Sequence, residues 1–80
     1  MSYLFFEANR TNFDDGKGNE VPLGDLLDYL RSQGGSPECF DSCDEDNRTV
    51  AMTKARTTGL HLYVVDEDDY RVVGVVNTAD

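Results

Sequence analysis

The chain has 80 residues, of which 16 are Asp or Glu and 7 are Lys or Arg, so its formal net charge is −9 and its pI is near 4.2. A chain this short forms one domain, over residues 1–80, and has little room for an enclosed substrate cavity beside its core. We therefore expect a binding protein rather than an enzyme. The charge opposes direct contact with nucleic acid or anionic membranes and favours basic protein surfaces as partners.

The chain also carries no signal for a membrane or for export. No apolar run approaches the roughly 18 residues that cross a bilayer. Residues 1–6 have neither the basic start nor the small-residue cleavage site of a signal peptide. We expect a cytosolic protein, and no motif predicts a cofactor.

Residues 2–8 are rich in aromatic and apolar side chains and predict a strand. Tyr3 and Phe5 would lie on one face of this strand, and Leu4 and Phe6 on the other. Because both faces are apolar, we expect a central strand rather than an edge.

Residues 9–20 are polar and contain two glycines, which predicts an exposed loop with Phe13 as an anchor to the core. A helix over residues 22–33 follows, because four leucines recur at i, i+3, i+4 and i+7. Pro22 suits its first turn, and Gly34 with Gly35 ends it. These leucines are Leu23, Leu26, Leu27 and Leu30.

Residues 36–47 are acidic and have a proline near their start, so we expect an irregular segment. Phe40, in the middle of this segment, should hold it against the body of the domain. Three strands are then expected, over residues 48–57, 60–65 and 70–76. Thr58 and Gly59 would turn the first into the second, and residues 66–69 the second into the third. Three strands with such short connections predict an antiparallel meander.

The predicted fold class is therefore α+β, with element order β-α-β-β-β. We expect a mostly antiparallel four-stranded sheet with one helix on its face and the other face partly in water. The valine-rich strand over residues 70–76 could pair edge to edge in a dimer, although nothing in the sequence selects a dimer over a monomer.

The residues that usually carry chemistry do not form a recognisable site. His61 is the only histidine and falls in a predicted strand without a local nucleophile or acid, which favours a structural role. Cys39 and Cys43 are spaced C-x3-C and match no familiar zinc motif; free thiols are favoured over a disulfide, and a disulfide over a metal. The acidic clusters fail the EF-hand spacing, and no glycine-rich phosphate loop is present.

What remains is the distribution of acids, together with aromatic residues between them that could anchor a partner. We predict that the acids contact a basic surface in the way that DNA phosphates do. The predicted binding residues are Asp14, Asp15, Asp25, Asp28, Glu38, Asp41, Asp44, Glu45, Asp46, Asp66, Glu67, Asp68 and Asp69. The candidate aromatic anchors are Phe13, Tyr29, Phe40 and Tyr70.

In length, acidity and lack of catalytic motifs, the chain resembles the small phage-encoded inhibitors, namely anti-CRISPR proteins and DNA mimics that block restriction or repair enzymes. The resemblance rests on no shared motif. It implies a protein that occupies a basic nucleic-acid channel, for instance in a CRISPR surveillance complex, and so prevents target-DNA binding. Two alternatives stay open: a salt-adapted domain whose acids serve hydration, and a metal or redox protein that uses Cys39 and Cys43.

Overall fold

The computed structural model of the chain describes residues 2–35, 37 and 39–78. The elements follow in this order: β1 (Ser2–Glu7), β2 (Asn12–Asp14), β3 (Glu20–Pro22), α1 (Leu23–Gln33), β4 (Asp41–Asp44), α2 (Arg48–Thr57), β5 (Leu62–Asp66) and β6 (Arg71–Val76). Four strands form one sheet in the order β4-β1-β5-β6, and all of its pairings are antiparallel. The short strands β2 and β3 form a second, two-stranded sheet. The predicted α+β class and antiparallel four-stranded sheet are confirmed.

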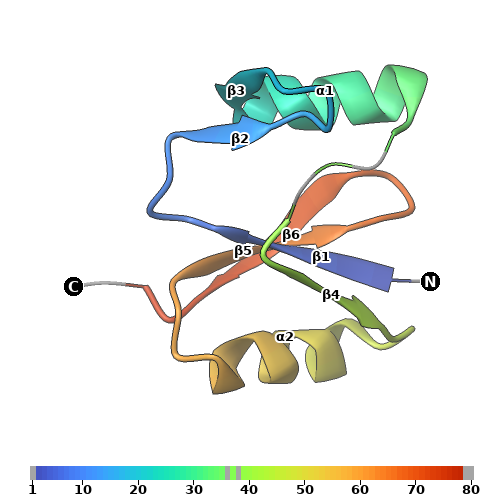
Figure 1. The fold of residues 1–80 in the computed structure, drawn as a ribbon. Helices are drawn as coiled ribbons and strands as arrows, with labels where there is room; N and C mark the ends of the chain where they lie inside the picture. The colour runs from blue at the N-terminus through green and yellow to red at the C-terminus, as the bar shows by residue number, and fades with distance from the viewer. Residues whose placement is uncertain (1, 36, 38, 79–80) are drawn as a thin grey trace.

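The molecule has three layers, with the four-stranded sheet in the middle (Figure 1). Helix α1 and the β2–β3 sheet lie over one face, and helix α2 lies over the other. The prediction of a single helix and a face partly in water is therefore wrong. The second helix covers the face that we expected to be solvated.

Strand β1 supplies side chains to both layers of the core. Tyr3 and Phe5 are buried against α2, whereas Leu4 and Phe6 are buried with the leucines of α1. The prediction of a central strand with two apolar faces is confirmed, because β1 lies between β4 and β5. β1 therefore contributes to two hydrophobic clusters, one beneath α1 and the other beneath α2.

Helix α1 confirms the prediction from leucine spacing. Pro22 is its N-cap residue, and Leu26, Leu27 and Leu30 are buried. The chain leaves the helix at Gly34, whose φ of 71° is in the left-handed region that glycine adopts without strain.

Helix α2 occupies residues that we expected to form a strand. Asn47 caps the helix: its Oδ1 accepts hydrogen bonds from the backbone N–H groups of Thr49 and Val50, at 2.8 and 3.3 Å. Ala51 and Ala55, four residues apart, are fully buried against the sheet. Small residues at this spacing let a helix approach a sheet closely. The strand prediction is wrong because the threonines between them produce an alternation of residues that is typical of a strand.

The two predicted loops contain strands as well. Asp41–Asp44 form β4, which pairs with the edge of β1 and gives its backbone groups hydrogen-bond partners. Phe13 is buried in β2 and meets Phe6 edge to face at 5.5 Å, so its predicted role as an anchor is confirmed. Phe40 is 45% exposed, so the prediction that its side chain holds the segment in place is wrong. Its backbone does so instead, by an N–H donated to the carbonyl of Phe5 at 2.8 Å.

The residue that follows β6 is attached to α2. Asn77 has a φ of 51°, and its side-chain Nδ2 donates to the carbonyl oxygens of Ala55, Arg56 and Leu60 at 3.5, 3.2 and 2.9 Å. Asparagine tolerates this backbone conformation better than most residues. The residue thus joins the end of β6 to the last turn of α2.

We expect the Asn47→Ala variant to lose about 1 kcal/mol of unfolding free energy, because two N–H groups of α2 lose their acceptor. Urea denaturation followed by circular dichroism measures this loss. The Asn47→Ser variant is the control, since serine restores a capping oxygen without changing the charge. Equal midpoints for the Ala and Ser variants would show that the cap does not stabilise α2.

Candidate functional site

The antiparallel sheet brings two acidic segments, distant in sequence, to the same place. The end of β4 and the end of β5 both lie beside the start of β1, because both strands run antiparallel to it. Ser2 is paired with Asp44, and its carbonyl accepts a hydrogen bond from the N–H of Glu67 at 3.0 Å. One residue of β1 therefore lies between the two acidic segments.

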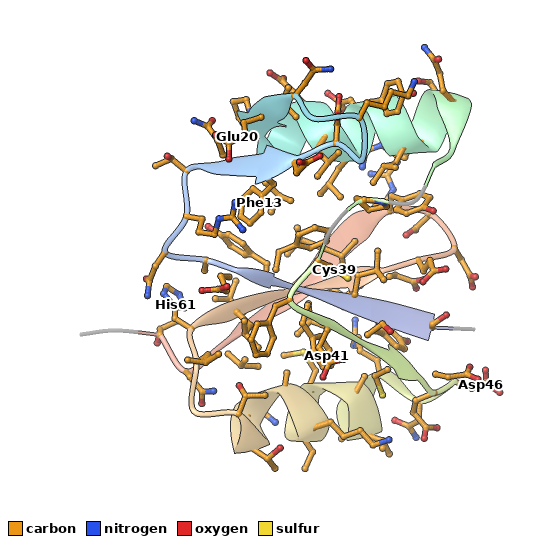
Figure 2. All side chains as sticks on the ribbon, in the orientation of Figure 1. Phe13, Glu20, Cys39, Asp41, Asp46 and His61 are labelled. Carbon is orange, nitrogen blue, oxygen red and sulfur yellow. The ribbon has the colours of Figure 1, made fainter. Side chains whose placement is uncertain are left out.

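We call this region the acidic end. It consists of Asp44, Glu45, Asp46, Asp66, Glu67, Asp68 and Asp69. Figure 1 shows its two segments, the β4–α2 connection and the β5–β6 turn, on the same side of the molecule as the start of β1. Figure 2 shows Asp46 at this side, next to the start of α2. The start of a helix attracts negative charge, so α2 stabilises the acids beside it.

The charges of both acidic segments affect the hydroxyl of Tyr3. Its side chain is buried, and burial is the main reason that the pKa of its hydroxyl is raised. The negative charges of Asp66, Asp68 and Asp46 raise this pKa further, and Arg48 partly opposes them. Carboxylates from both segments are therefore close enough to the same hydroxyl to affect its ionisation.

Some carboxylates of the acidic end accept hydrogen bonds from backbone N–H groups of neighbouring residues. Glu45 Oε1 accepts from the N–H groups of Asp46 and Asn47 at 3.1 and 3.3 Å. Asp66 Oδ1 accepts from the N–H of Asp68 at 2.9 Å. These hydrogen bonds shape the two turns.

A second group of carboxylates is available to a partner. Within the described part of the chain, the side chains of Asp44, Glu67 and Asp68 have no hydrogen bond or ion pair. Asp44 and Asp68 are also exposed. These three residues are the strongest candidates for contact with a basic surface.

The remaining predicted acids lie elsewhere, and several have structural roles. In the β2–β3 turn, Asp14 Oδ1 accepts from the N–H groups of Gly16 and Gly18 at 2.7 and 3.3 Å. Asp15 Oδ1 accepts from the N–H of Lys17 at 2.8 Å, and this hydrogen bond is the main reason that the pKa of Asp15 is lowered. These two acids stabilise a turn.

The acids of α1 and of the start of β4 are also separate from the acidic end. Asp28 pairs with Arg31, and Asp25 lies in the first turn of the helix, where it suits the dipole. Asp41 is paired with Phe5, at the opposite end of β4 from Asp44. The predicted residue Glu38 lies outside the described residues.

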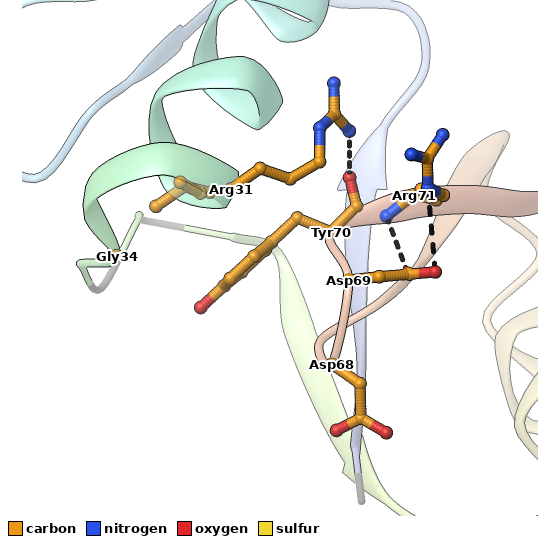
Figure 3. A pocket seen from close by; sticks show the side chains of 7 residues that line it. Arg31, Gly34, Asp68, Asp69, Tyr70 and Arg71 are labelled. Carbon is orange, nitrogen blue, oxygen red and sulfur yellow. Dashed lines mark hydrogen bonds and ion pairs between the residues drawn. The ribbon is translucent and has the colours of Figure 1, made fainter.

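An open pocket of about 480 Å³ adjoins the acidic end, between the C-terminal end of α1 and the β5–β6 turn. Figure 3 shows Asp69 turned toward Arg71, whereas the carboxylate of Asp68 points away from both arginines. Tyr70 also lines a smaller pocket of about 160 Å³, together with Leu4, Gly35, Pro37 and Glu67. The larger pocket is lined by Leu30, Arg31, Gly34, Asp68, Asp69, Tyr70 and Arg71.

Tyr70, which lines both pockets, has an unusual backbone conformation. Its φ is 52°, a left-handed value that costs a tyrosine roughly 1–2 kcal/mol. Arg31 Nη1 donates to its carbonyl at 2.7 Å, and its ring packs half-buried against the α1 side of the core. The Tyr70 ring was expected to anchor a partner, and here it lines the pocket beside Asp68.

The other predicted aromatic anchors are less suitable. Phe13 is buried, and Tyr29 is occupied by Lys17, whose Nζ donates to its hydroxyl at 2.7 Å. Phe40 is exposed but precedes β4 at the end away from Asp44. No local sequence pattern identifies Arg31 as a pocket residue, because its contact with Tyr70 joins positions 39 residues apart.

The two cysteines do not form a common site. Both are free; Cys43 is buried on the α2 side of the sheet, whereas Cys39 packs against the α1 side. Burial raises the pKa of Cys39, and the charges of Asp41 and Glu67 raise it further. No group of three or more metal-binding side chains occurs among the described residues.

His61 lies at the far end of the sheet from the acidic end (Figure 2). Its Nδ1 is 3.1 Å from Oδ1 of Asn9, and its carbonyl accepts from the N–H of Ala8 at 2.8 Å. These contacts join the ends of β1 and β5. They support the structural role that we expected.

No protein-family model, curated protein or solved structure matches the chain. Among the described residues, neither helix has the length and apolar character needed to cross a bilayer.

We expect Cys39 to react with iodoacetamide several-fold more slowly in the native chain than in urea. A raised pKa leaves less thiolate at pH 7, and the thiolate is the nucleophile. Peptide mass spectrometry over time measures the rate for each cysteine separately. A native rate equal to the unfolded rate would contradict both the burial of this thiol and its raised pKa.

Proposed function

We propose that this chain is a binding protein, without catalytic activity, that docks its acidic end onto a basic nucleic-acid-binding surface of another protein. In doing so it blocks access of nucleic acid to that surface, as an inhibitor of a defence complex such as a CRISPR surveillance complex. The observation that carries the proposal is the meeting of residues 44–46 and 66–69 at the start of β1.

The spacing of the strands supports mimicry of a phosphate backbone. Neighbouring strands lie about 4.8 Å apart, so carboxylates at the ends of β4 and β5, on either side of β1, span about 10 Å. Phosphates along one DNA strand advance by about 3.4 Å along the helix axis, so this span corresponds to about three phosphate steps. Arginines arranged for a short stretch of backbone would therefore find carboxylates at comparable distances.

The pocket beside Tyr70 supports a specific anchor. Asp68 offers an exposed carboxylate, and the ring of Tyr70 offers an aromatic surface close to it. An arginine side chain stacks well on aromatic rings and binds carboxylates with two parallel hydrogen bonds. Arg31 and Arg71 also line the pocket, but each is paired with an aspartate, so the unpaired charge that a partner arginine would meet there is that of Asp68.

We expect a tagged wild-type chain to retain a nucleic-acid-processing complex from nuclease-treated host lysate at low salt, and to release part of it at moderate salt. Salt screens the attraction between the acidic end and a basic surface. The Asp44→Lys/Asp68→Lys variant should lose at least tenfold in affinity for the retained complex, measured by biolayer interferometry. DNA should compete with the wild-type chain for the same complex.

The control is Glu20→Lys/Asp25→Lys, which changes the net charge by the same amount on the α1 side of the molecule. Both variants must unfold at urea concentrations close to that of the wild type. Equal losses in the two variants would indicate an effect of net charge and contradict a site at the acidic end. A chain that retains no complex, but gains several kcal/mol of stability in molar salt, would support the salt-adapted alternative.

A further inference from the structure

The β6 strand forms an open edge of the sheet. It pairs with β5 on one side, and no backbone hydrogen bond joins Val72–Val76 to any other described segment. The row of N–H and C=O groups along such an edge is a template for another strand. β6 has six residues, long enough to accept one.

Two valines of this strand are exposed on the same face. Val72 is 43% exposed and Val75 is 39% exposed, and they are paired with Val65 and Tyr63 of β5, which both face α1. They share this face although they are three residues apart, because Val73 is an extra residue in the pairing with β5. Their exposure shows that α1 does not cover this part of the sheet.

The opposite edge of the sheet differs in charge. β4 has only four residues, and two of them are aspartates. β6 has no acid between Arg71 and Val76, in a chain with a net charge of −9. Charged side chains, short length and bulges protect an edge from pairing; β6 has one charged residue, Arg71, at its start and the extra residue Val73, but no charge from Val72 to Val76.

We propose that β6 is a self-association edge, at which a second copy of this chain pairs antiparallel to form a two-fold dimer with a continuous eight-stranded sheet. The preferred register places Val72 of each copy opposite Val75 of the other. The four exposed valines then form cross-strand pairs on one face of the joined sheets. The same surface patch on both copies satisfies the symmetry of a dimer.

The distribution of charge selects the antiparallel arrangement. The acidic β5–β6 turn lies at the start of β6, so antiparallel pairing places the two turns at opposite ends of the shared edge. Six residues of strand separate them by about 20 Å, which is beyond the Debye length of about 8 Å at physiological salt. Parallel pairing would place the two acidic turns side by side.

Sedimentation velocity of the purified wild-type chain over about 1 μM to 1 mM should show a monomer–dimer equilibrium. Added salt should strengthen the dimer, because it screens the repulsion between two chains of net charge −9. The Val75→Lys variant should dissociate at least tenfold more readily, since an edge lysine opposes pairing.

The matched control is Val50→Lys, because Val50 lies on α2 and is also 39% exposed. It makes the same change in charge and in side chain away from the β6 edge, and it should leave dimerisation within about twofold of the wild type. Urea denaturation of both variants at low concentration checks that each chain is folded. A monomer at every concentration, or equal weakening by the two lysines, would overturn the proposal.

Discussion

The packing of β1 between two helical layers is the constraint on which the rest of the structure depends. Because Tyr3 and Phe5 point to one side and Leu4 and Phe6 to the other, the chain must supply an apolar cover for both faces. The first cover comes from the leucines of α1, and the second from the alanines of α2. A chain of 80 residues can build both covers only by keeping each element short.

The same constraint positions the acids. The backbone of a buried central strand needs a partner on each side, and β4 and β5 provide them in antiparallel orientation. Their ends therefore reach the start of β1, where carboxylates remain in solvent beside the first turn of α2. The acids can concentrate there because these side chains do not belong to the hydrophobic core, and because the N-terminus of α2 favours negative charge.

The sequence predicts the elements whose signal is local. The leucine spacing of α1, the two apolar faces of β1 and the turn between β5 and β6 are all visible in consecutive residues. The sequence does not predict helix α2, because its threonines and small residues alternate as in a strand and because its cap, Asn47, directly follows an acidic run typical of a loop. The acidic end and the contact between Arg31 and Tyr70 depend on strand order, which residue patterns do not encode locally.

The side chain of Asn77 gives the C-terminal strand a role in the cooperativity of folding. Three carbonyl oxygens, two at the end of α2 and one just before β5, accept hydrogen bonds from a single amide group at the end of β6. An edge strand at the end of a chain ordinarily opens by fraying, independently of the rest of the fold. Here, opening of β6 from its Val76 end also breaks the hydrogen bonds from Asn77 to the last turn of α2, which covers one face of the central strand. We therefore expect the edge and the helix to open together, so that exchange of their backbone amides with solvent is linked.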